Sequence, residues 1–387
     1  MSKSRFLVVD VSGKVLNYDY ALCQAMTDEA CGEVEVVLAA HLHDKDKYHG
    51  RRLRLLSLIP RSQQTSSGKL KRIVKAAEGF INYTFVLLYI IVKHPSVVHF
   101  QWLPYLEFSS VEIPYIKLIR FFKSHIKLIY TIHNVYPHSM IQVDRRPPYR
   151  QRFMRMMPLI DHFVVHTGSA ATEVKNAFDI ARSRISIVSH GIFKPDYKLK
   201  NNHDCRNEKK TIIFYGANRR NKGADILLDA VHLLPEEHKN HVRILMLGRT
   251  PNDYLNELKS KCSGIDVTLD PRFIPDEELY EMIDASDYIA LPYREITQSG
   301  VLLLALYFKK PLLISNLPPF LETLRGFSKD MFFEAGNPNS MSDLIVRHLE
   351  GKIDVEKELN LIMNLNSDYS WENSAIKTLN IYKKVII

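Results

Sequence analysis

Cysteine is scarce in this chain. Its 387 residues include only Cys23, Cys31, Cys205 and Cys262, and none of these has the CxxC spacing of a metal knuckle or a redox motif. Four cysteines without that spacing do not indicate a disulfide framework, so we interpret them as reduced thiols of a cytosolic protein. The first ten residues, MSKSRFLVVD, lead directly into a strand-like run, and we expect no secretory signal.

Long apolar runs are also missing. The most apolar stretch, FINYTFVLLYIIV at 80–92, is shorter than a bilayer-spanning helix and contains Asn82, Tyr83 and Thr84. We therefore expect it to form the end of a buried helix. Hydrophobic residues make up 46% and charged residues 25% of the chain, which is typical of a folded globular protein rather than a disordered one.

Several short catalytic and binding motifs are absent as well. The sequence has no GxxxxGK[ST] loop for nucleoside triphosphates and no GxGxxG fingerprint for dinucleotides. Its 16 histidines include no HExxH pair, and no GxSxG marks a hydrolase. The DKD sequence at 44–46 has the spacing of a metal-binding aspartate pair. It lies among Lys and His neighbours with no strand directly before it, so we interpret it as a solvated loop.

Basic charge is concentrated in the first half. Residues 1–195 contain 27 Lys and Arg against 15 Asp and Glu, whereas residues 196–387 contain 25 against 28. Such an excess of basic residues can bind nucleic acid, an anionic membrane or an anionic substrate. No zinc-finger, RNP-like or basic-zipper pattern accompanies it, so we expect no nucleic-acid partner. An anionic lipid surface or a lipid-phosphate acceptor fits better, with a merely solvated basic face as an equal alternative. Much of this charge lies in 49–61, 68–75 and 144–155, which we interpret as surface helices and loops.

Short β-branched runs alternate with segments of helical length along the whole chain. Near-continuous apolar strands separated by helices indicate parallel sheets covered on both faces. The predicted strands lie at 5–10, 34–40, 97–102, 127–133, 162–167 and 185–191 in the first half, and at 211–216, 243–248, 266–270, 288–293, 311–315 and 331–335 in the second. This number suits two sheets of six strands rather than one sheet.

A polar segment rich in Lys and Asn separates the two halves, as a linker should. We therefore predict an α/β protein with two Rossmann-like domains facing each other across a cleft. The first domain is expected at 1–195, the linker at 196–210 and the second domain at 211–365. A C-terminal helix at 366–387 is expected to pack back on the first domain.

In such sheets, ligands bind beyond the carboxyl ends of the strands. Glycine and polar residues collect at those ends in both halves, which random placement would not produce. In the first half they are Gly13, His133, Asn134, His166, Thr167, His190 and Gly191, and in the second half Gly216, Gly248 and Pro292. The sequence therefore predicts a ligand site at this edge of each sheet.

The segment FYGANRRNKGADILLDA at 214–230 predicts a strand that ends at Gly216, a short basic loop, and a helix that opens after Lys222 and Gly223. Gly223 would let the loop pass close to a ligand, while Arg219 and Lys222 would present cations to it. Taken alone, the segment would be better interpreted as a solvated turn.

A second candidate is the polar patch of Thr297, Gln298, Ser299 and Gly300, directly before the apolar run VLLLALYF. Hydroxyl side chains at a helix start accept hydrogen bonds from free amides, so capping alone would explain the patch. The same amides, with the helix dipole behind them, also form an anion site.

The order of these segments resembles the donor-binding domain of GT-B glycosyltransferases, specifically the retaining family 4. It runs strand–Gly–x–x–Arg–x–x–Lys–Gly–helix, then IPDEELYEMIDASDYIALPY, then TQSGVLLLALYFKKPLLIS. Further matches are TIHN after the fourth predicted strand, SHGIF near the end of the first half, and the closing YSWENSAIKTLNIYKKV. The resemblance covers essentially the whole chain and is strongest from 211 to 316. It implies the GT-B fold, with a nucleotide-sugar donor on the second domain and the acceptor on the basic first domain.

Carried over residue by residue, the resemblance implies that Lys222 binds the donor diphosphate. Ala217 occupies the position of the family's usual arginine, and Arg219 is the nearest cation that can replace it. His133 matches the histidine beside the transferred sugar, with a structural strand-end histidine as the alternative. The donor site is expected to include Gly13, Gly216, Gly248 and Ile274, with the diphosphate cradled by Thr297, Gln298, Ser299, Gly300 and Val301.

Two positions depart from the family pattern. Members usually carry two glutamates here with seven residues between them, at the positions of Thr297 and Ala305. The first glutamate normally contacts the donor sugar and the second the ribose, so recognition of both is expected to differ. The implied mechanism needs no carboxylate nucleophile. Two cations and a helix N-terminus would stabilise the leaving diphosphate, so we expect no metal and no cofactor.

These features predict a cytoplasmic, retaining glycosyltransferase of surface-polysaccharide biosynthesis. It would act on a glycan or lipid-linked acceptor and be peripheral at the inner membrane face. Two alternatives stay open: a non-catalytic GT-B subunit that binds a partner glycosyltransferase or glycan, and a GT-B sugar-nucleotide epimerase, which would need carboxylates near the diphosphate loop. The clusters expected to meet anionic lipid are Arg51, Arg52 and Arg54, and then Lys69, Lys71, Arg72 and Lys75.

Overall fold

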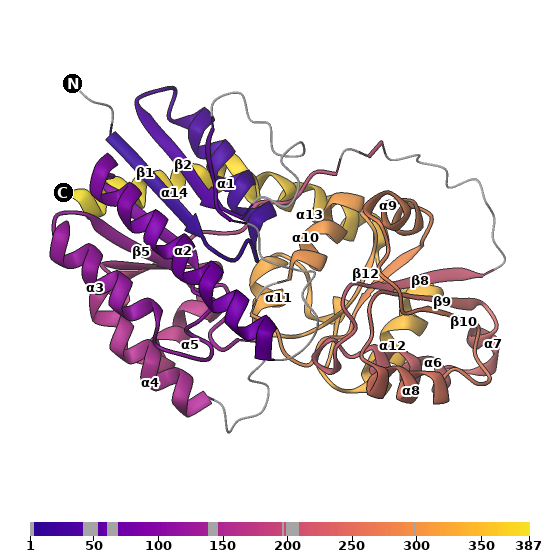
Figure 1. Cartoon of the computed structure of the whole chain (residues 1–387). Helices are drawn as coiled ribbons and strands as arrows, with labels where there is room; N and C mark the ends of the chain where they lie inside the picture. The colour runs from indigo at the N-terminus through magenta and orange to yellow at the C-terminus, as the bar shows by residue number, and fades with distance from the viewer. Residues whose placement is uncertain are drawn as a thin grey trace. The chain divides into compact units, whose positions relative to one another are not determined.

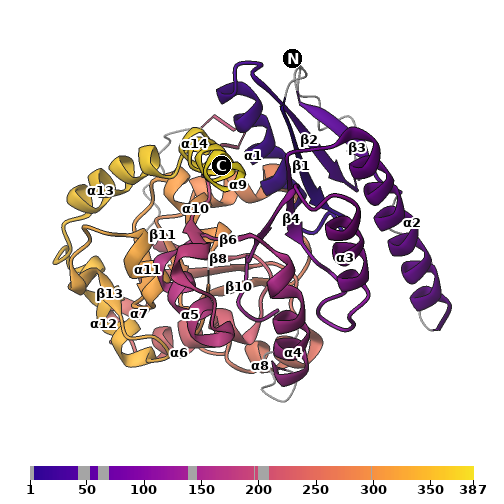
Figure 2. The same ribbon diagram turned by 90° about the vertical axis from the view of Figure 1, so that its left-hand side faces the viewer.

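The computed structural model describes residues 4–41, 53–59, 69–137, 146–195, 197–198, 209–297 and 299–387. The chain divides into two compact units, Met1–Gly191 with Ser370–Ile387, and Ile192–Tyr369 (Figures 1 and 2). The chain passes between them twice, and the two crossings touch, because the Ile192 amide donates to the Tyr369 carbonyl at 2.7 Å. Most of the segment expected to be a linker, 196–210, lies outside the described residues.

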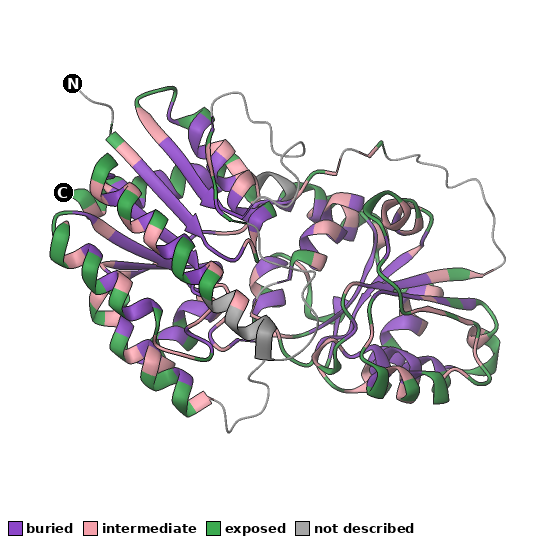
Figure 3. Ribbon diagram, in the orientation of Figure 1, coloured by how far each residue is buried: buried purple, intermediate pink, exposed green. Residues whose placement is uncertain are grey.

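The first unit is built on a parallel sheet with the order β3-β2-β1-β4-β5-β6-β7. Its central strands are buried along most of their length, because their near-continuous apolar runs are covered on both faces (Figure 3). The strands are β1 Ser4–Asp10, β2 Val34–Ala40, β3 Arg54–Ser57, β4 Val97–Trp102, β5 Lys127–Thr131, β6 His162–Val165 and β7 Ile185–Ile187.

The expectation of six strands in this half is wrong, because β3 adds a seventh. The segment 49–61 was interpreted as surface helix or loop, yet Arg54–Ser57 pairs in parallel with β2. As an edge strand it has one partner and only half-buried leucines, so it lacks the continuous apolar run of a central strand. Arg54 also forms an ion pair with Glu35 of β2 at 2.8 Å, which offsets its charge on the sheet.

Helices cover both faces of this sheet: α1 Leu16–Glu29, α2 Lys69–Lys93, α3 Glu112–Phe122, α4 Arg146–Met156, α5 Gly168–Phe178 and α14 Trp371–Ile386, with 3-10 turns η4 Met157–Leu159 and η5 Arg182–Arg184. The C-terminal helix α14 packs beside α1 (Figure 1). Its buried Tyr382 contacts the ring of Phe6 edge-on at 5.0 Å and hydrogen-bonds His99 at 2.7 Å. These contacts place Tyr382 of α14 in the core of the first unit.

The apolar stretch 80–92 belongs to α2 but is not simply a buried helix end. Tyr83, Val86 and Ile90 are buried, whereas Phe80 and Val92 are each 65% exposed. One face therefore packs on the sheet, and the opposite face is apolar and open to solvent. In the part of the chain that the structure describes, no helix combines the length and apolar content needed to cross a membrane.

The second unit has a six-stranded parallel sheet in the order β10-β9-β8-β11-β12-β13, and the six strands predicted for this half are confirmed. They are β8 Lys210–Tyr215, β9 Val242–Leu247, β10 Val267–Asp270, β11 Tyr288–Leu291, β12 Leu312–Ser315 and β13 Phe332–Phe333. The helices are α6 Ala224–His232, α7 Glu236–Lys239, α8 Asn252–Ser260, α9 Asp276–Asp284, α10 Gly300–Phe308, α11 Pro318–Thr323, α12 Pro338–Leu349 and α13 Val355–Asp368, with 3-10 turns η6 Arg220–Lys222 and η7 Lys329–Met331.

Both sheets reverse their strand order beside the first strand of the unit. In the first unit β1 lies between β2 and β4, and in the second β8 lies between β9 and β11. Loops from neighbouring strands leave in opposite directions at such a point and open a crevice at the carboxyl edge. The Rossmann-like architecture predicted from the sequence is confirmed in both units, and it places a candidate site beyond β1 and β4, and another beyond β8 and β11.

Candidate functional site

In the second unit, glycines bring three loops close together. Gly248, after β9, has φ +122°, and a Cβ there would lie 1.9 Å from the carbonyl oxygen of Gly216, after β8. Gly223 has φ +68°, and a Cβ there would lie 1.9 Å from the carbonyl oxygen of Pro292, after β11. Any larger residue at Gly223 or Gly248 would push these backbones apart.

The Lys222 side chain crosses the mouth of this loop cluster. Its ammonium lies 5.1 Å from the centroid of the Tyr293 ring. It is 3.3 Å from where a Cβ on Gly216 would be, and Val301 approaches the same point to 3.4 Å. Within the described residues, no carboxylate forms an ion pair with Lys222. The structure thus brings Gly216, Lys222 and Val301 together, as the sequence predicted, around an ammonium free to meet an anion.

The N-terminus of α10 adjoins this ammonium. The Ser299 hydroxyl caps the helix by accepting the Leu302 amide at 3.1 Å, and the Tyr215 hydroxyl donates to the Val301 carbonyl at 3.0 Å. A Cβ built on Gly300 meets nothing within 4 Å among the described residues, so no neighbour crowds this position. The helix dipole makes this position favourable for an anion. Thr297 is half-buried at the entrance, and Gln298 lies outside the described residues.

Two other residues predicted for the donor site are Arg219 and Ile274. Arg219 is exposed at the start of η6, and no ion pair holds its guanidinium among the residues described. Its neighbour Arg220 is instead paired with Glu257 at 2.5 Å. Ile274 is 6% exposed and belongs to the hydrophobic core around α9 and α10, so its side chain contributes packing.

Sequence reasoning missed the ion pair that holds the Lys222 loop. Arg294 donates to both carboxylate oxygens of Asp225, at 2.8 and 2.6 Å, and also to the Arg220 carbonyl at 2.9 Å. The Tyr254 hydroxyl donates to the same carboxylate at 2.6 Å. Burial alone would raise the pKa of Asp225, but the hydrogen bonds from Arg294 and Tyr254 outweigh it and hold that pKa below its usual range. The only sequence signal for this ion pair was Asp225, two places after Lys222–Gly223. An acidic residue is also ordinary in the first turn of a helix.

In the first unit, Asp10 shapes the loop after β1. One carboxylate oxygen accepts the Ser12 amide at 3.0 Å and the Ser12 hydroxyl at 2.8 Å, and the other accepts the Val15 amide at 3.1 Å. Gly13 follows with φ +61°, and a Cβ there would lie 2.9 Å from the His41 carbonyl oxygen. The predicted Gly13 therefore lies in a tight turn at the switch point between β1 and β4.

His133 and His166 meet beyond the ends of the neighbouring strands β5 and β6. Nδ1 of His133 lies 3.0 Å from Nε2 of His166, and Nδ1 of His166 lies 2.9 Å from the Val188 carbonyl oxygen. Because a carbonyl only accepts, Nδ1 of His166 must carry the proton. Burial lowers the pKa of His166 to about 4, so at neutral pH its Nε2 is a bare acceptor. His133 must then donate through Nδ1, which leaves its own Nε2 as a lone pair.

The surroundings of His133 keep it neutral. Burial, followed by the nearby His166 and His190, holds the pKa of His133 well below its usual range. Its ring packs edge-on against Tyr18, with centroids 5.0 Å apart, and lies beside Trp102 at 5.9 Å. Nε2 is buried, and the described residues offer it no hydrogen-bond partner. The ring therefore presents an unused acceptor atom.

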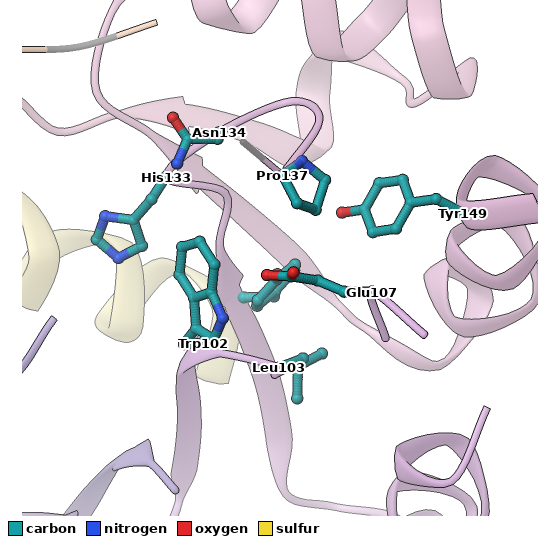
Figure 4. A pocket seen from close by; sticks show the side chains of 8 residues that line it. Trp102, Leu103, Glu107, His133, Asn134, Pro137 and Tyr149 are labelled. Carbon is teal, nitrogen blue, oxygen red and sulfur yellow. The ribbon is translucent and has the colours of Figure 1, made fainter. Parts of the chain in front are cut away.

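A pocket opens beside this imidazole (Figure 4). Lys14, from the loop after β1, lies 4.0 Å from the centroid of the Trp102 indole and 3.1 Å from a carboxylate oxygen of Glu107. Sequence reasoning did not single out Lys14, Trp102 or Glu107. The walls of the pocket combine an indole face, a carboxylate and an amide, groups that suit a polar, ring-shaped ligand. They belong to Trp102, Leu103, Glu107, Tyr130, His133, Asn134, Pro137 and Tyr149.

Comparison with known proteins covers both units. Residues 196–365 match the family described as glycosyl transferases group 1, and residues 19–193 match glycosyltransferase family 4. A D-inositol 3-phosphate glycosyltransferase of Corynebacterium urealyticum is 22% identical over 275 residues, which span 64% of this chain and 65% of that protein. The match therefore leaves about a third of the corynebacterial protein uncovered.

Solved structures of similar fold cover nearly the whole chain. A sucrose-phosphate synthase from Thermosynechococcus elongatus superposes with a TM-score of 0.70 at 15% identity, covering 99% of each chain. Anabaena HepE, solved in complex with UDP and glucose, superposes with a TM-score of 0.67 at 13% identity, covering 98% of this chain and 100% of that one. At such identities the likeness concerns the fold.

Proposed function

Since the chain belongs to the GT-B glycosyltransferases of the family 4 type, with one glycosyltransferase family matched by each half, we propose that it transfers a sugar from a nucleotide-diphosphate donor with retention of configuration. The acceptor in this proposal is a glycan or a lipid-linked sugar of surface-polysaccharide biosynthesis. The complexes of Anabaena HepE with UDP and with UDP-glucose support a uridine nucleotide as the first donor to test.

The observation that carries the proposal is the approach of the Lys222 ammonium to the start of α10, over Gly216. When the glycosidic bond to the donor breaks, negative charge develops on the diphosphate. A fixed cation and a helix N-terminus stabilise that charge, and they need no reorganisation during the reaction. Arg219 is exposed on the same loop and adds a second cation once a nucleotide is bound. These groups supply the charge stabilisation that a metal provides elsewhere, so the proposed reaction uses no metal.

His133 acts on the sugar in this proposal. Its Nε2 lone pair accepts a hydrogen bond from a hydroxyl of the transferred sugar, which orients the ring without adding positive charge beside an oxocarbenium-like centre. The pocket of Trp102 and Glu107 beside it receives the acceptor. Because Thr297 and Ala305 replace the usual glutamates, the donor sugar and ribose are held by other groups, and a panel of donors is needed.

The enzyme is proposed to be cytoplasmic and peripheral at the inner membrane face. The excess of Lys and Arg in residues 1–195 supports attraction to an anionic surface or a phosphate-bearing lipid acceptor.

Asp225 bears on the epimerase alternative. It adjoins the Lys222 loop, and its pairing with Arg294 and Tyr254 occupies it structurally. A free catalytic acid or base is what an epimerase would need there. The non-catalytic alternative rests on the missing glutamates alone.

Incubation of the purified chain with a panel of nucleotide sugars, without acceptor, tests the proposal. Slow release of free sugar with retained configuration fits a transferase, an epimerised nucleotide sugar fits the epimerase, and neither product fits a non-catalytic subunit. Thermal shift on the same panel identifies the nucleotide, since a ligand at about a hundred times its dissociation constant stabilises the fold by about 2.7 kcal/mol. Lys222→Ala is the matched control and should lose both sugar release and the thermal shift.

A further inference from the structure

The outer face of α2 is an apolar stripe. Over 79–92 the helix contains no charged residue, so almost four turns are free of charge. The side facing the sheet is buried. The opposite side exposes Phe80 (65%), Ile81 (47%), Phe85 (45%), Leu88 (54%) and Val92 (65%). Ile81, Phe85, Leu88 and Val92 follow helical spacing and form one line along the helix, and Phe80 lies about 100° around the helix from Ile81.

Helix α3 lies beside α2 and extends the same kind of surface. The two helices are neighbours in Figures 1 and 2, and the rings of Phe80 and Tyr115 meet edge-on with centroids 6.3 Å apart. Around α3 the exposed apolar side chains are Phe108 (70%), Val111 (46%), Leu118 (40%), Phe121 (81%) and Phe122 (51%). Figure 3 shows exposed residues in green along both helices. We call the ten residues together the α2–α3 apolar face.

So many large side chains on two adjacent helices exceed the scattered apolar exposure of an ordinary soluble surface. Packing of the first unit does not require them, because Tyr83, Val86, Ile90, Ile113 and Ile116 already fill the core beneath. Removing Phe and Leu side chains from water is favourable in proportion to the apolar area covered. An uncovered face of this size therefore has a strong tendency to bind something apolar.

The charges along the face are positive. Lys93 at the end of α2 and Lys117 on α3 are exposed. The acidic residue of α3, Glu112, is buried and accepts a hydrogen bond from Tyr83 at 2.5 Å. Along α2 the sequence places Lys69, Lys71, Arg72, Lys75 and Lys93 against Glu78 alone. An apolar stripe with cations beside it is the arrangement that binds in the plane of an anionic bilayer surface.

We propose that the α2–α3 apolar face docks the enzyme on an anionic membrane, with its aromatic and aliphatic side chains in the headgroup region and Lys93 and Lys117 at the lipid phosphates. The proposal rests on the proposed location of the enzyme at a membrane, but not on its catalysis. A protein partner or a second copy of the chain would bury the apolar residues equally well, but the exposed Lys93 and Lys117 beside them favour an anionic bilayer.

This face does not include the basic clusters that the sequence predicts to meet lipid, and those clusters stay a prediction. Arg54 is engaged with Glu35 on the sheet edge, so it is a poor lipid contact. Arg51 and Arg52 lie outside the described residues, and so do the side chains of Lys69, Lys71, Arg72 and Lys75. The apolar residues of 80–92 and 108–122, which charge counting overlooked, carry the surface instead.

Flotation of the full chain with phosphatidylcholine vesicles, with and without phosphatidylglycerol, tests the proposal. The wild type is expected to float with the anionic vesicles, less at high salt, and poorly with neutral ones. The triple variant Phe85→Gln, Leu88→Gln and Val92→Gln should lose at least tenfold in partitioning. The matched control, Leu233→Gln with Met363→Gln, removes side chains of 49% and 43% exposure from the second unit and should float like the wild type.

Three results would overturn the proposal: a wild type that stays in solution with anionic vesicles, equal partitioning on neutral and anionic lipid, or a triple variant that floats unchanged. A wild-type dimer in sedimentation that the triple variant dissociates, without any lipid effect, would assign the face to self-association instead. Donor hydrolysis separates the two proposals. A triple variant that hydrolyses donor at the wild-type rate but no longer floats supports docking, and a wild type that floats but never releases sugar refutes only the proposed transfer.

Discussion

Nε2 of His166 accepts a hydrogen bond from Nδ1 of His133 over 3.0 Å, and this contact determines which nitrogen of His133 keeps a lone pair. The chain of bonds begins at the Val188 carbonyl, which forces the proton of His166 onto Nδ1. Each ring thereby fixes the tautomer of the next. His166 is a positioning residue in this arrangement, because it touches no substrate and acts through His133.

Replacement of His166 should therefore change the tautomer of His133. His166→Phe removes the acceptor, so no hydrogen bond stabilises the Nδ1–H tautomer of His133. We expect kcat to fall by about tenfold to a hundredfold, the range found when an outer partner of a functional histidine is removed. His166→Gln, whose amide offers both a donor and an acceptor, should recover part of the loss. Nitrogen-15 spectra of the histidines report the tautomer directly, and an Nε2–H form of His133 in the wild type would contradict the assignment.

Removal of the Lys222 ammonium should cost roughly a hundredfold or more in kcat, as expected for one group that stabilises developing charge on a leaving group. Lys222→Ala is the test, with Lys259→Ala, at an exposed position of α8, as the matched loss of a lysine. Initial rates at saturating donor separate an effect on chemistry from one on binding. Wild-type turnover in Lys222→Ala would remove the donor-site assignment.

The pair of Asp225 and Arg294 should stabilise the second unit and hold Lys222 in place. Asp225→Asn weakens a doubly hydrogen-bonded ion pair, and we expect a loss of about 1.5–3 kcal/mol in the free energy of unfolding. Arg294→Met leaves Asp225 without its cation and should cost a similar amount. Because the two residues act as a unit, the double variant should lose less than the sum of the single ones. Urea titration measures all three, and strictly additive losses would mean that the pair contributes little.

Much of the fold could be predicted because its signals are local. Continuous apolar runs identified twelve of the strands, and strand-end glycines located both carboxyl edges. The edge strand β3 was missed because an edge needs no continuous apolar run. The exposed face of α2 was not predicted, because a helical segment without charged residues is expected to be buried. The sequence does not show that only one side of this helix packs on the sheet.

Within the candidate site, only the residues that belong to sequence motifs could be predicted. Gly216, Lys222 and Val301 meet as expected, since each follows or opens an element at one sheet edge. The ion pair of Asp225 with Arg294 joins residues 69 positions apart, and either residue alone looks like an ordinary surface charge. The tautomer of His133 depends on a backbone carbonyl of Val188, which no side-chain pattern could reveal.

Chelation should leave activity largely intact. Lys222, Arg219 and the start of α10 supply positive potential to the diphosphate. An added metal ion is therefore not needed to neutralise the negative charge of the diphosphate. Donor hydrolysis is measured after dialysis against EDTA, with and without added manganese or magnesium. Full dependence on either ion would restore the metal-binding interpretation of Asp44 and Asp46, which lie outside the described residues.

Glu358 should make the second unit less stable as the pH rises. Its carboxyl on α13 is 1% exposed and accepts one hydrogen bond, from the Leu312 amide at 2.7 Å. Burial raises its pKa from 4.5 to about 7, against the effect of that hydrogen bond. Between those two values the unfolded chain has released the proton while the folded chain retains it. The folded state binds more protons there, so the free energy of unfolding falls with pH, by roughly 3 kcal/mol over the interval.

Glu358→Gln removes this dependence while keeping an oxygen for the Leu312 amide. At pH 4.5 the variant and the wild type should have similar stability, because the wild-type carboxyl is then largely protonated in the folded state. At pH 8 the variant should be more stable by about 1–3 kcal/mol, the smaller figure allowing for relaxation around a buried charge. Urea titrations at several pH values measure the difference in free energy of unfolding between the variant and the wild type. The contributions of the other titrating groups are common to both proteins and cancel. Glu356→Gln, an exposed neighbour on the same helix, should show no such trend, and a flat difference for Glu358→Gln would mean that its carboxyl ionises normally in the folded protein.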